Sequence, residues 1–227
     1  HHLIHCPRAL TKTCMDMKMI CIIILVVFLP FGVFAQNWQW ANSGGGTNFD
    51  MLGTGCIAID KSGNTYVTGS FYDKMTIDTI QLIGNGWNKD VFWAKFDKNG
   101  RVVWAKSIGG KGEENDFTGT GGIVVDSNNN VYVFLSFSDT ITTPEIQAYN
   151  SGMWNDLLLI KCDSNGKVLN YKSWGTLFSE TAQGLSIDVN DKIYLYGTFA
   201  GYNGSIPPSD SLRTLWFDST HSVLSQI

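Results

Sequence analysis

The sequence repeats itself, and this internal repeat constrains the possible folds more than any other feature. One block occurs three times: GCIAIDKSGNTYVTGSF at 55–71, GGIVVDSNNNVYVFLSF at 121–137 and QGLSIDVNDKIYLYGTF at 183–199. The starting residues Gly55, Gly121 and Gln183 lie 66 and 62 positions apart. Self-similarity at such a spacing indicates a chain built from copies of one supersecondary unit.

A second block follows the first in each copy. DVFWAKFDKNGRVVWAKSIGG at 90–110 matches DLLLIKCDSNGKVLNYKSWG at 156–175, again 66 positions later. A weaker third copy, LRTLWFDSTHSVL, occupies 212–224, and residues 38–42 match residues 102–106. We therefore divide the chain after residue 35 into three units, which span 36–100, 101–166 and 167–227.

Each unit carries the pattern of four antiparallel strands. Residues 64–71 alternate and are rich in β-branched and aromatic types, whereas 91–94 and 157–160 are apolar at successive positions, as in strands covered on both faces. Short turns separate the strands, and they begin at Asp60, Asp97, Asp126, Asp163 and Asp188. Asp caps such turns with its side chain, while Gly or Asn supplies the positive φ. Four antiparallel strands per unit predict an all-β fold made of β-propeller blades.

The units are longer than the ~40–45 residues of a common four-stranded blade. The surplus lies between the two hairpins of each unit, at 72–89, 138–155 and 200–211. We predict long loops there, all at one face of the blades, with a short extra strand such as Met75 to Leu82. No long apolar stripe of helical period follows residue 35, so helices are predicted to be minor at most.

Both repeated blocks resemble SBBP-type β-propeller repeats, in which an AVDxxGNxYVTGSF strand pair is followed by KxDxxGxxxW. The resemblance covers residues 37–224. It implies an exported bacterial surface or secreted protein that continues into further repeats. It implies no activity, so no catalytic residue is carried over. The third unit departs most from the pattern, with Trp216 in the place of a Lys and no Gly after Asp218.

The predicted ring is incomplete. The chain supplies about three blades, against the 4–8 of a closed propeller. An open array of repeats leaves an apolar face uncovered at each end. We therefore expect further blades of a longer parent protein, or association with another copy, to complete the ring.

The first 35 residues differ from the rest. An almost unbroken apolar run at 19–35 follows Lys12 and Lys18 and ends on VFA before a polar pair. This pattern predicts a signal peptide at 15–35, cleaved between Ala35 and Gln36. An uncleaved membrane anchor is the alternative, although a span usually needs ~20 apolar residues. Residues 1–14 precede the first methionine and are predicted to be a non-native or upstream leader.

The net charge and the predicted export limit which kinds of partner the chain can have. After residue 35 the chain holds 13 basic and 19 acidic residues, a net charge of −6. This balance argues against a nucleic-acid partner, which requires a clustered basic face. We predict a secreted or cell-surface protein whose mature chain has no membrane span. Its partner is predicted to be an extracellular protein or glycan of unknown identity.

Few residues after position 35 can carry catalysis or bind a metal. His221 is the only histidine there, so a Ser-His-Asp triad would have to use it. A zinc site would have only this histidine and two separated cysteines as its usual ligands. Cys56 and Cys162 are interpreted as small buried hydrophobic residues, with a disulfide between them as the alternative. We predict no catalytic residue, no metal site and no cofactor, and the ligand-binding residues stay unknown.

Three groups of residues allow two interpretations each. The Asp-rich turns supply oxygen atoms that could bind calcium, but turn chemistry explains them. Glu113, Glu114 and Asp116 lie together in an acidic loop. Either this loop is simply solvated, or it supplies the two carboxylates of a glycoside hydrolase site. Trp87 and Trp154 lie in or beside the long loops, where they either pack or form a platform for a ligand.

The sequence thus favours a non-enzymatic binding scaffold. Part of an extracellular enzyme is the alternative, with a glycosidase, lyase or quinone-type dehydrogenase site at the mouth of the propeller. A passive spacer on a larger surface protein is a third hypothesis.

Overall fold

β-Strands joined by turns make up the computed structural model, which describes residues 39–46, 48, 50, 52, 55–84, 88–110, 119–152, 154–175, 177, 179–199 and 215–217. No helix occurs among them, so none of the described residues forms a helical membrane span. The prediction of an all-β fold is confirmed. Residues 40–227 form one compact unit, which is described below.

The first unit forms a four-stranded antiparallel sheet, here called the first sheet. Its strands follow the chain in the order β2 (Ile57–Ile59), β3 (Thr65–Tyr72), β6 (Lys89–Phe96) and β7 (Val102–Ile108). The second sheet has the same order, with β8 (Gly119–Val125), β9 (Val131–Phe137), β12 (Asp156–Cys162) and β13 (Val168–Trp174). The prediction of four antiparallel strands per unit is thus confirmed for these two units.

The third unit contributes three strands within the described residues. The third sheet consists of β14 (Glu180–Ile187), β15 (Ile193–Phe199) and β16 (Leu215–Phe217) in that order. Strand β16 pairs with β15 in antiparallel register, with Trp216 opposite Tyr194. The weakly matching third copy of the second block therefore places its strand at the expected position.

The middle strands are covered on both faces. Every described side chain of β9 is buried, and β12 is buried at all positions except Lys161. Successive side chains on these strands point to opposite faces of the sheet. Those on one face belong to a hydrophobic cluster shared with the first sheet, and those on the other face belong to a cluster shared with the third sheet. The second sheet therefore lies sandwiched between its neighbours, as the continuous apolar runs predict.

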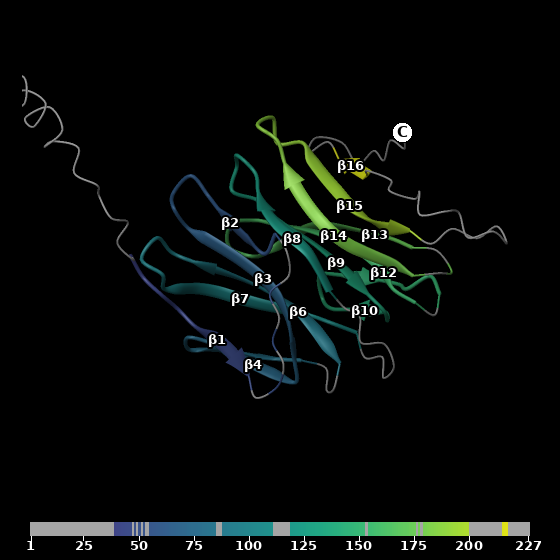
Figure 1. The fold of residues 1–227 in the computed structure, drawn as a ribbon, viewed down its shortest axis with the longest axis horizontal. Helices are drawn as coiled ribbons and strands as arrows, with labels where there is room; N and C mark the ends of the chain where they lie inside the picture. Colours follow the sequence, from purple (N-terminus) through teal and green to yellow (C-terminus); the bar gives the residue numbers. More distant parts are fainter. Residues whose placement is uncertain are drawn as a thin grey trace, which may run out of the picture. The chain divides into compact units, whose positions relative to one another are not determined.

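The first strands of the three sheets lie next to one another (Figure 1). The amide of Ile123 in β8 donates to the carbonyl of Gly55 just before β2, at 3.0 Å. A Cβ on Gly121 would lie 2.9 Å from the Cβ of Ala182 in β14. The glycine therefore allows β8 and β14 to approach closely.

The long connections contain hairpins that enter the core. In the first unit β4 (Lys74–Ile77) pairs with β5 (Ile80–Ile83), and β1 (Gly44–Gly46) pairs with β4. In the second unit β10 (Ile141–Thr142) pairs with β11 (Gln147–Ala148). The single extra strand predicted for the first loop is thus a pair of strands. Its side chains Met75, Ile77 and Leu82 are buried because they pack on the first sheet.

In each of the first two sheets, a tryptophan from an earlier segment of the chain packs over a glycine of the second turn. Trp104 of β7 lies over the turn residue Gly166 of the second sheet, and its Nε1 donates to the carbonyl of Ser164 at 3.2 Å. Trp40 lies in the same way over Gly100 of the first sheet. The segment around Trp40 thus takes the place of an outermost strand, as its match to residues 102–106 predicts.

Candidate functional site

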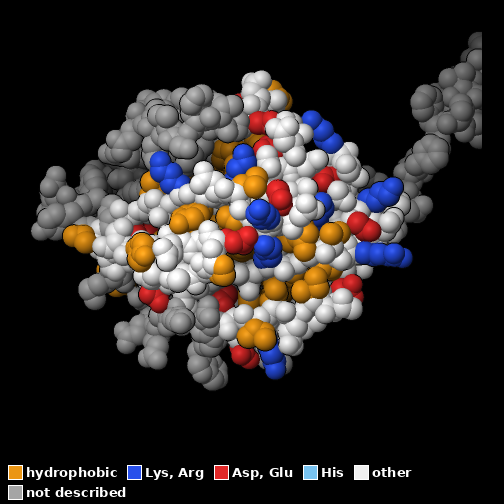
Figure 2. Space-filling model, turned by 180° about the vertical axis from the view of Figure 1, so that it is seen from behind, with side chains coloured by type: hydrophobic (Ala, Val, Ile, Leu, Met, Phe, Trp, Pro, Cys, Tyr) orange, Lys and Arg blue, Asp and Glu red, His pale blue; other side chains and the backbone are white. Residues whose placement is uncertain are grey.

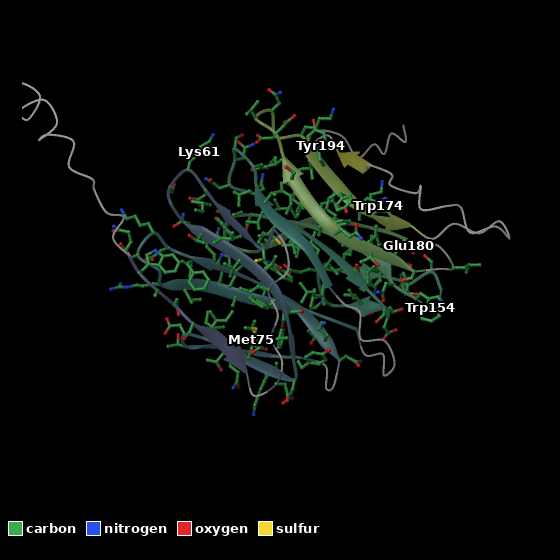
Figure 3. The ribbon with its side chains drawn as sticks, viewed as in Figure 1. Lys61, Met75, Trp154, Trp174, Glu180 and Tyr194 are labelled. Carbon is green, nitrogen blue, oxygen red and sulfur yellow. The ribbon has the colours of Figure 1, made fainter. Side chains whose placement is uncertain are left out.

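The two ends of the sheets differ. One end, here called the turn face, carries the tight turns that begin at Asp60, Asp97, Asp126, Asp163 and Asp188. The other end, the loop face, carries the connections from β3 to β6 and from β9 to β12 and the passages between sheets. Figure 3 shows Lys61 near the first end and Trp154 and Glu180 together near the second. The prediction of long loops at one face is confirmed for the first two units, whereas 200–211 lies outside the described residues.

The carboxylates of the turn face are used within their own turns. Oδ1 of Asp60 accepts the amides of Ser62 and Asn64 at 2.8 and 2.9 Å. Its Oδ2 accepts the Asn64 side-chain amide at 2.8 Å and the hydroxyl of Tyr66 at 3.2 Å. Burial acts to raise the pKa of Asp60, but these hydrogen bonds together outweigh it and lower the pKa. Burial and the negative charge of Asp60 raise the pKa of the Tyr66 hydroxyl.

The same arrangement recurs in the other two units. Asp126 binds two turn amides, the Asn130 side chain and the Tyr132 hydroxyl. Asp188 binds two turn amides and the hydroxyl of Tyr194. The described residues contain no group of three or more His, Cys, Asp or Glu side chains that could hold a metal ion. The turn interpretation explains these aspartates, because the turn amides and the tyrosine hydroxyl occupy their carboxylates.

Two buried carboxylates lie at the base of the loop face. Asp90 and Asp156 begin β6 and β12 and are 2% and 1% exposed. Each packs against a glycine after the neighbouring outer strand: a Cβ on Gly109 would lie 1.6 Å from Oδ1 of Asp90, and a Cβ on Gly175 would lie 2.0 Å from Oδ1 of Asp156. Sequence reasoning missed this pairing, although each Asp opens the second repeated block and each Gly lies at the equivalent position near its end.

The Asp156 carboxyl holds the loop that precedes it. Its Oδ2 accepts the amide of Ser151 at 2.7 Å, while its Oδ1 has no hydrogen-bond partner among the residues that the structure describes. Burial raises the pKa of this carboxyl, and the hydrogen bond from Ser151 opposes that rise without cancelling it. Because the wall formed by Gly175 leaves the carboxyl almost no exposed surface, its role is to position the loop.

We expect Asp156 to make the protein less stable as the pH rises. A carboxyl with a folded-state pKa above its unfolded value near ~3.9 contributes stability at low pH, and this contribution is lost as the pH rises through the folded-state pKa. Asp156→Asn keeps an acceptor for Ser151 but cannot ionise. Calorimetry between about pH 4 and pH 7 should therefore show a smaller loss of Tm in this variant than in the wild type. An unchanged pH dependence would contradict the assignment, and Asp163→Asn in an exposed turn is the control.

Backbone and hydroxyl contacts join the second and third sheets near the loop face. The amide of Glu180 donates to the carbonyl of Asn155 at 2.7 Å. The amide of Ala182 donates to Oγ of Ser136 at 2.7 Å. Glu180 is fully buried and Asn155 is 5% exposed, so this junction is shielded from bulk solvent. These contacts fix the passage from β13 to β14 relative to the loop before β12.

Three large apolar side chains are exposed on the loop face of the second sheet. Tyr149, Trp154 and Leu177 are 64%, 50% and 71% exposed, and we call them the apolar platform. The side chain of Asn150 ties the platform down, because its Nδ2 donates to the carbonyls of Phe137 and Trp154 at 3.3 and 2.5 Å. The backbone of Leu177 lies against Gly152 of the same loop. The three side chains are thus exposed, the loop that carries Tyr149 and Trp154 is held by hydrogen bonds of Asn150, and Leu177 packs against that loop.

The structure describes only some of the residues that the sequence pattern singled out. Trp154 is exposed, which favours the ligand-platform interpretation over the packing one. Several other predicted residues lie outside the described residues, namely Trp87, Glu113, Glu114, Asp116, His221 and the predicted cleavage site at Ala35 and Gln36. Tyr149 and Leu177 were not predicted, because single exposed apolar residues in a loop carry no sequence signal.

The two cysteines described by the structure are free. Cys162 ends β12, is fully buried and has its pKa raised to about 12 by burial, so it behaves as the predicted small hydrophobic residue. Cys56 is only half-buried and lies just before β2 rather than inside a strand. The prediction of a buried strand position is therefore wrong for Cys56, because β2 is short and begins one residue later.

No family model matches the chain, and no curated protein matches it. The resemblance to SBBP-type repeats therefore stays a prediction from the sequence.

Proposed function

We propose that this chain is part of an extracellular β-propeller that acts as a non-enzymatic binding scaffold for a protein or glycan. The loop face is the binding surface. The observation that carries the proposal is the apolar platform of Tyr149, Trp154 and Leu177, which the loop holds exposed by hydrogen bonds through Asn150.

The arrangement of the sheets supports the propeller. Consecutive units place antiparallel sheets of three or four described strands face to face, with their first strands adjacent at β2, β8 and β14. Radial repetition of such sheets around their first strands generates a propeller. An extracellular protein must be exported, and the predicted signal peptide at 15–35 supports export of this chain.

The chemistry of the platform supports binding. Exposed Trp and Tyr side chains offer large apolar surfaces with a polar tip, and they are common anchors of interfaces and of stacked sugars. Loops held on a rigid scaffold are the usual carriers of such contacts. Figure 2 shows positive, negative and apolar side chains interspersed on the face seen from behind, which supports a protein or glycan rather than a nucleic acid as the partner.

We expect Trp154→Ala to weaken binding about 10-fold or more, as loss of a central aromatic anchor does. The test is to screen the whole protein on a glycan array and against purified envelope proteins, and then to titrate the hits with the variant. Val189→Ala is the matched control, because Val189 is an apolar side chain that is 98% exposed on the turn face. Equal binding by both variants, or no hit for the intact protein, would contradict the proposal.

A further inference from the structure

The loop between β11 and β12 is held by the buried carboxyl that follows it. The loop exposes two side chains of the apolar platform, Tyr149 and Trp154. On its other side, Oδ2 of Asp156 accepts the amide of Ser151 at 2.7 Å. The side chain of Asn150 donates to the carbonyl of Trp154 within the loop. The orientation of the two aromatic residues therefore depends on a hydrogen bond to a group that can ionise.

Two walls cover the Asp156 carboxyl, and they differ in how easily they move. On one side, a Cβ on Gly175 would lie 1.9–2.1 Å from the three carboxyl atoms. Gly175 directly follows Trp174, which pairs with Leu157 of β12, so the ladder of the sheet holds this wall. On the other side lies the loop at Ser151, which is exposed. Water reaches the carboxyl most easily when this loop moves away.

The closed loop and the ionised carboxyl disfavour each other. With the loop closed, burial raises the pKa of Asp156, and only the hydrogen bonds from Ser151 oppose this effect. With the loop open, a solvated carboxyl has its ordinary pKa near ~3.9. The closed state therefore binds the proton more tightly than the open state. Acid favours closure, and a pH that rises through the closed-state pKa favours opening.

Three elements around Asp156 carry other charged side chains. Glu180 begins β14 and is fully buried. Lys172 of β13 lies with its Nζ 5.7 Å from the ring centroid of Trp174. Asp139 follows β9. The raised pKa of Asp156 comes from burial and not from any of these charges. Glu180 is nevertheless a second carboxyl at this junction, so an experiment has to separate the two.

We infer that Asp156 is a positioning residue of the apolar platform and makes the platform sensitive to pH. The loop holds Tyr149 and Trp154 in place in acid and releases them as the pH rises. The backbone of Leu177, the third platform residue, lies against Gly152 of the same loop, so it loses this neighbour when the loop moves. The inference rests on the proposed function only for its consequence, which is that a partner of the platform binds more tightly in acid.

Fluorine NMR of the full chain labelled with 5-fluorotryptophan tests the movement without any ligand. Trp154→Phe identifies the Trp154 resonance. Between about pH 4 and pH 7 we expect this resonance to follow a one-proton titration. The ratio of open to closed loop changes at most about tenfold per pH unit, because a single proton is released. In Asp156→Asn the resonance is expected to stay at the acid position, because the amide keeps an acceptor for Ser151 and does not ionise.

Matched variants assign the titration to one carboxyl. Asp90→Asn changes the equivalent buried carboxyl of the first sheet, and Glu180→Gln changes the second carboxyl at the junction. Both are expected to titrate like the wild type at Trp154. The other tryptophan resonances separate loop movement from unfolding, since unfolding shifts all of them together.

Each failure of this pattern overturns the inference. A Trp154 resonance that does not move in the wild type shows that the loop is insensitive to pH, and this result requires no variant to fold. A titration that persists in Asp156→Asn, or that disappears in Glu180→Gln, assigns the proton to another group. A protein that binds no partner contradicts the proposed function but leaves the NMR result standing. Where a partner is found, its affinity is expected to fall with rising pH in the wild type and to stay constant in Asp156→Asn.

Discussion

Gly175→Ala is expected to lower the free energy of unfolding by about 2–3 kcal/mol, as overpacking of a closed site does. A Cβ at this position would lie 1.9–2.1 Å from the three carboxyl atoms of Asp156. A flexible side chain could move aside, but Asp156 is 1% exposed and bound to the amide of Ser151. Either the carboxyl or the end of β13 must shift. Urea denaturation of the purified variant measures the loss.

A double-mutant cycle shows whether this collision is the cause. Asp156→Ala removes the carboxyl, so adding Gly175→Ala to that variant is expected to cost much less than it does in the wild type. Asp90 and Gly109 form the equivalent pair in the first sheet, and Gly109→Ala provides an independent repeat of the experiment. If Gly175→Ala costs the same with and without the Asp156 carboxyl, the strain arises elsewhere.

The paired Asp and Gly explain how each outer strand ends. The Asp begins the third strand of a sheet, and the Gly follows the fourth strand beside it. Burying the short carboxyl between strands is possible only where the neighbour lacks a side chain. The chain then leaves the sheet at this point and crosses to the next one. The pair thus lies where the loop face begins, and it fixes the base from which the loops start.

Much of the fold could be predicted because its determinants are local and repeated. The turn at Asp60 contains its own hydrogen-bond acceptors and donors, so a five-residue pattern specifies it. The apolar run of β12 specifies a strand with two covered faces. Each signal occurs in at least two units, and the copies confirm one another. The strand order of the first two sheets follows directly.

Features that depend on contacts between units could not be predicted in the same way. Ile141, Ile146 and Ala148 enter the core through a hairpin of two short strands, and such brief runs show no period. The apolar platform brings Trp154 beside a segment that follows β13, and nothing in either segment points to the other. The exposure of Cys56 depends on where β2 begins. These properties arise only when separate parts of the chain come together.

One contact between units does leave a trace in the sequence. Trp104 can lie over Gly166 because glycine has no side chain. A Cβ at that position would come within 3.1 Å of the indole. In the next unit the position of Trp104 is taken by Asn170, and the position of Gly166 is taken by His221. The tryptophan and the glycine are thus lost together. A side chain at the turn removes the space for the indole, so the two positions have to change as a pair.

Asp126→Ala is expected to be the most damaging change on the turn face, with a loss of about 3 kcal/mol in the free energy of unfolding. The carboxylate accepts four hydrogen bonds, from the amides of Asn128 and Asn130, the side chain of Asn130 and the hydroxyl of Tyr132. Tyr132 is 4% exposed, so its hydroxyl would stay buried without its acceptor. A buried donor that loses its partner costs more than the lost bond itself, since water cannot replace it.

The turn that begins at Asp163 supplies the matched control. Asp163 accepts only the amides of Asn165 and Lys167, and both bonds are exposed. Water can take the place of its carboxylate, so Asp163→Ala is expected to cost several-fold less than Asp126→Ala in the same denaturation experiment. Tyr132→Phe removes the buried donor, so adding Asp126→Ala to it should cost less than in the wild type. Equal losses for Asp126→Ala and Asp163→Ala would mean that the turn amides alone account for the stabilisation, and that the buried hydroxyl contributes nothing.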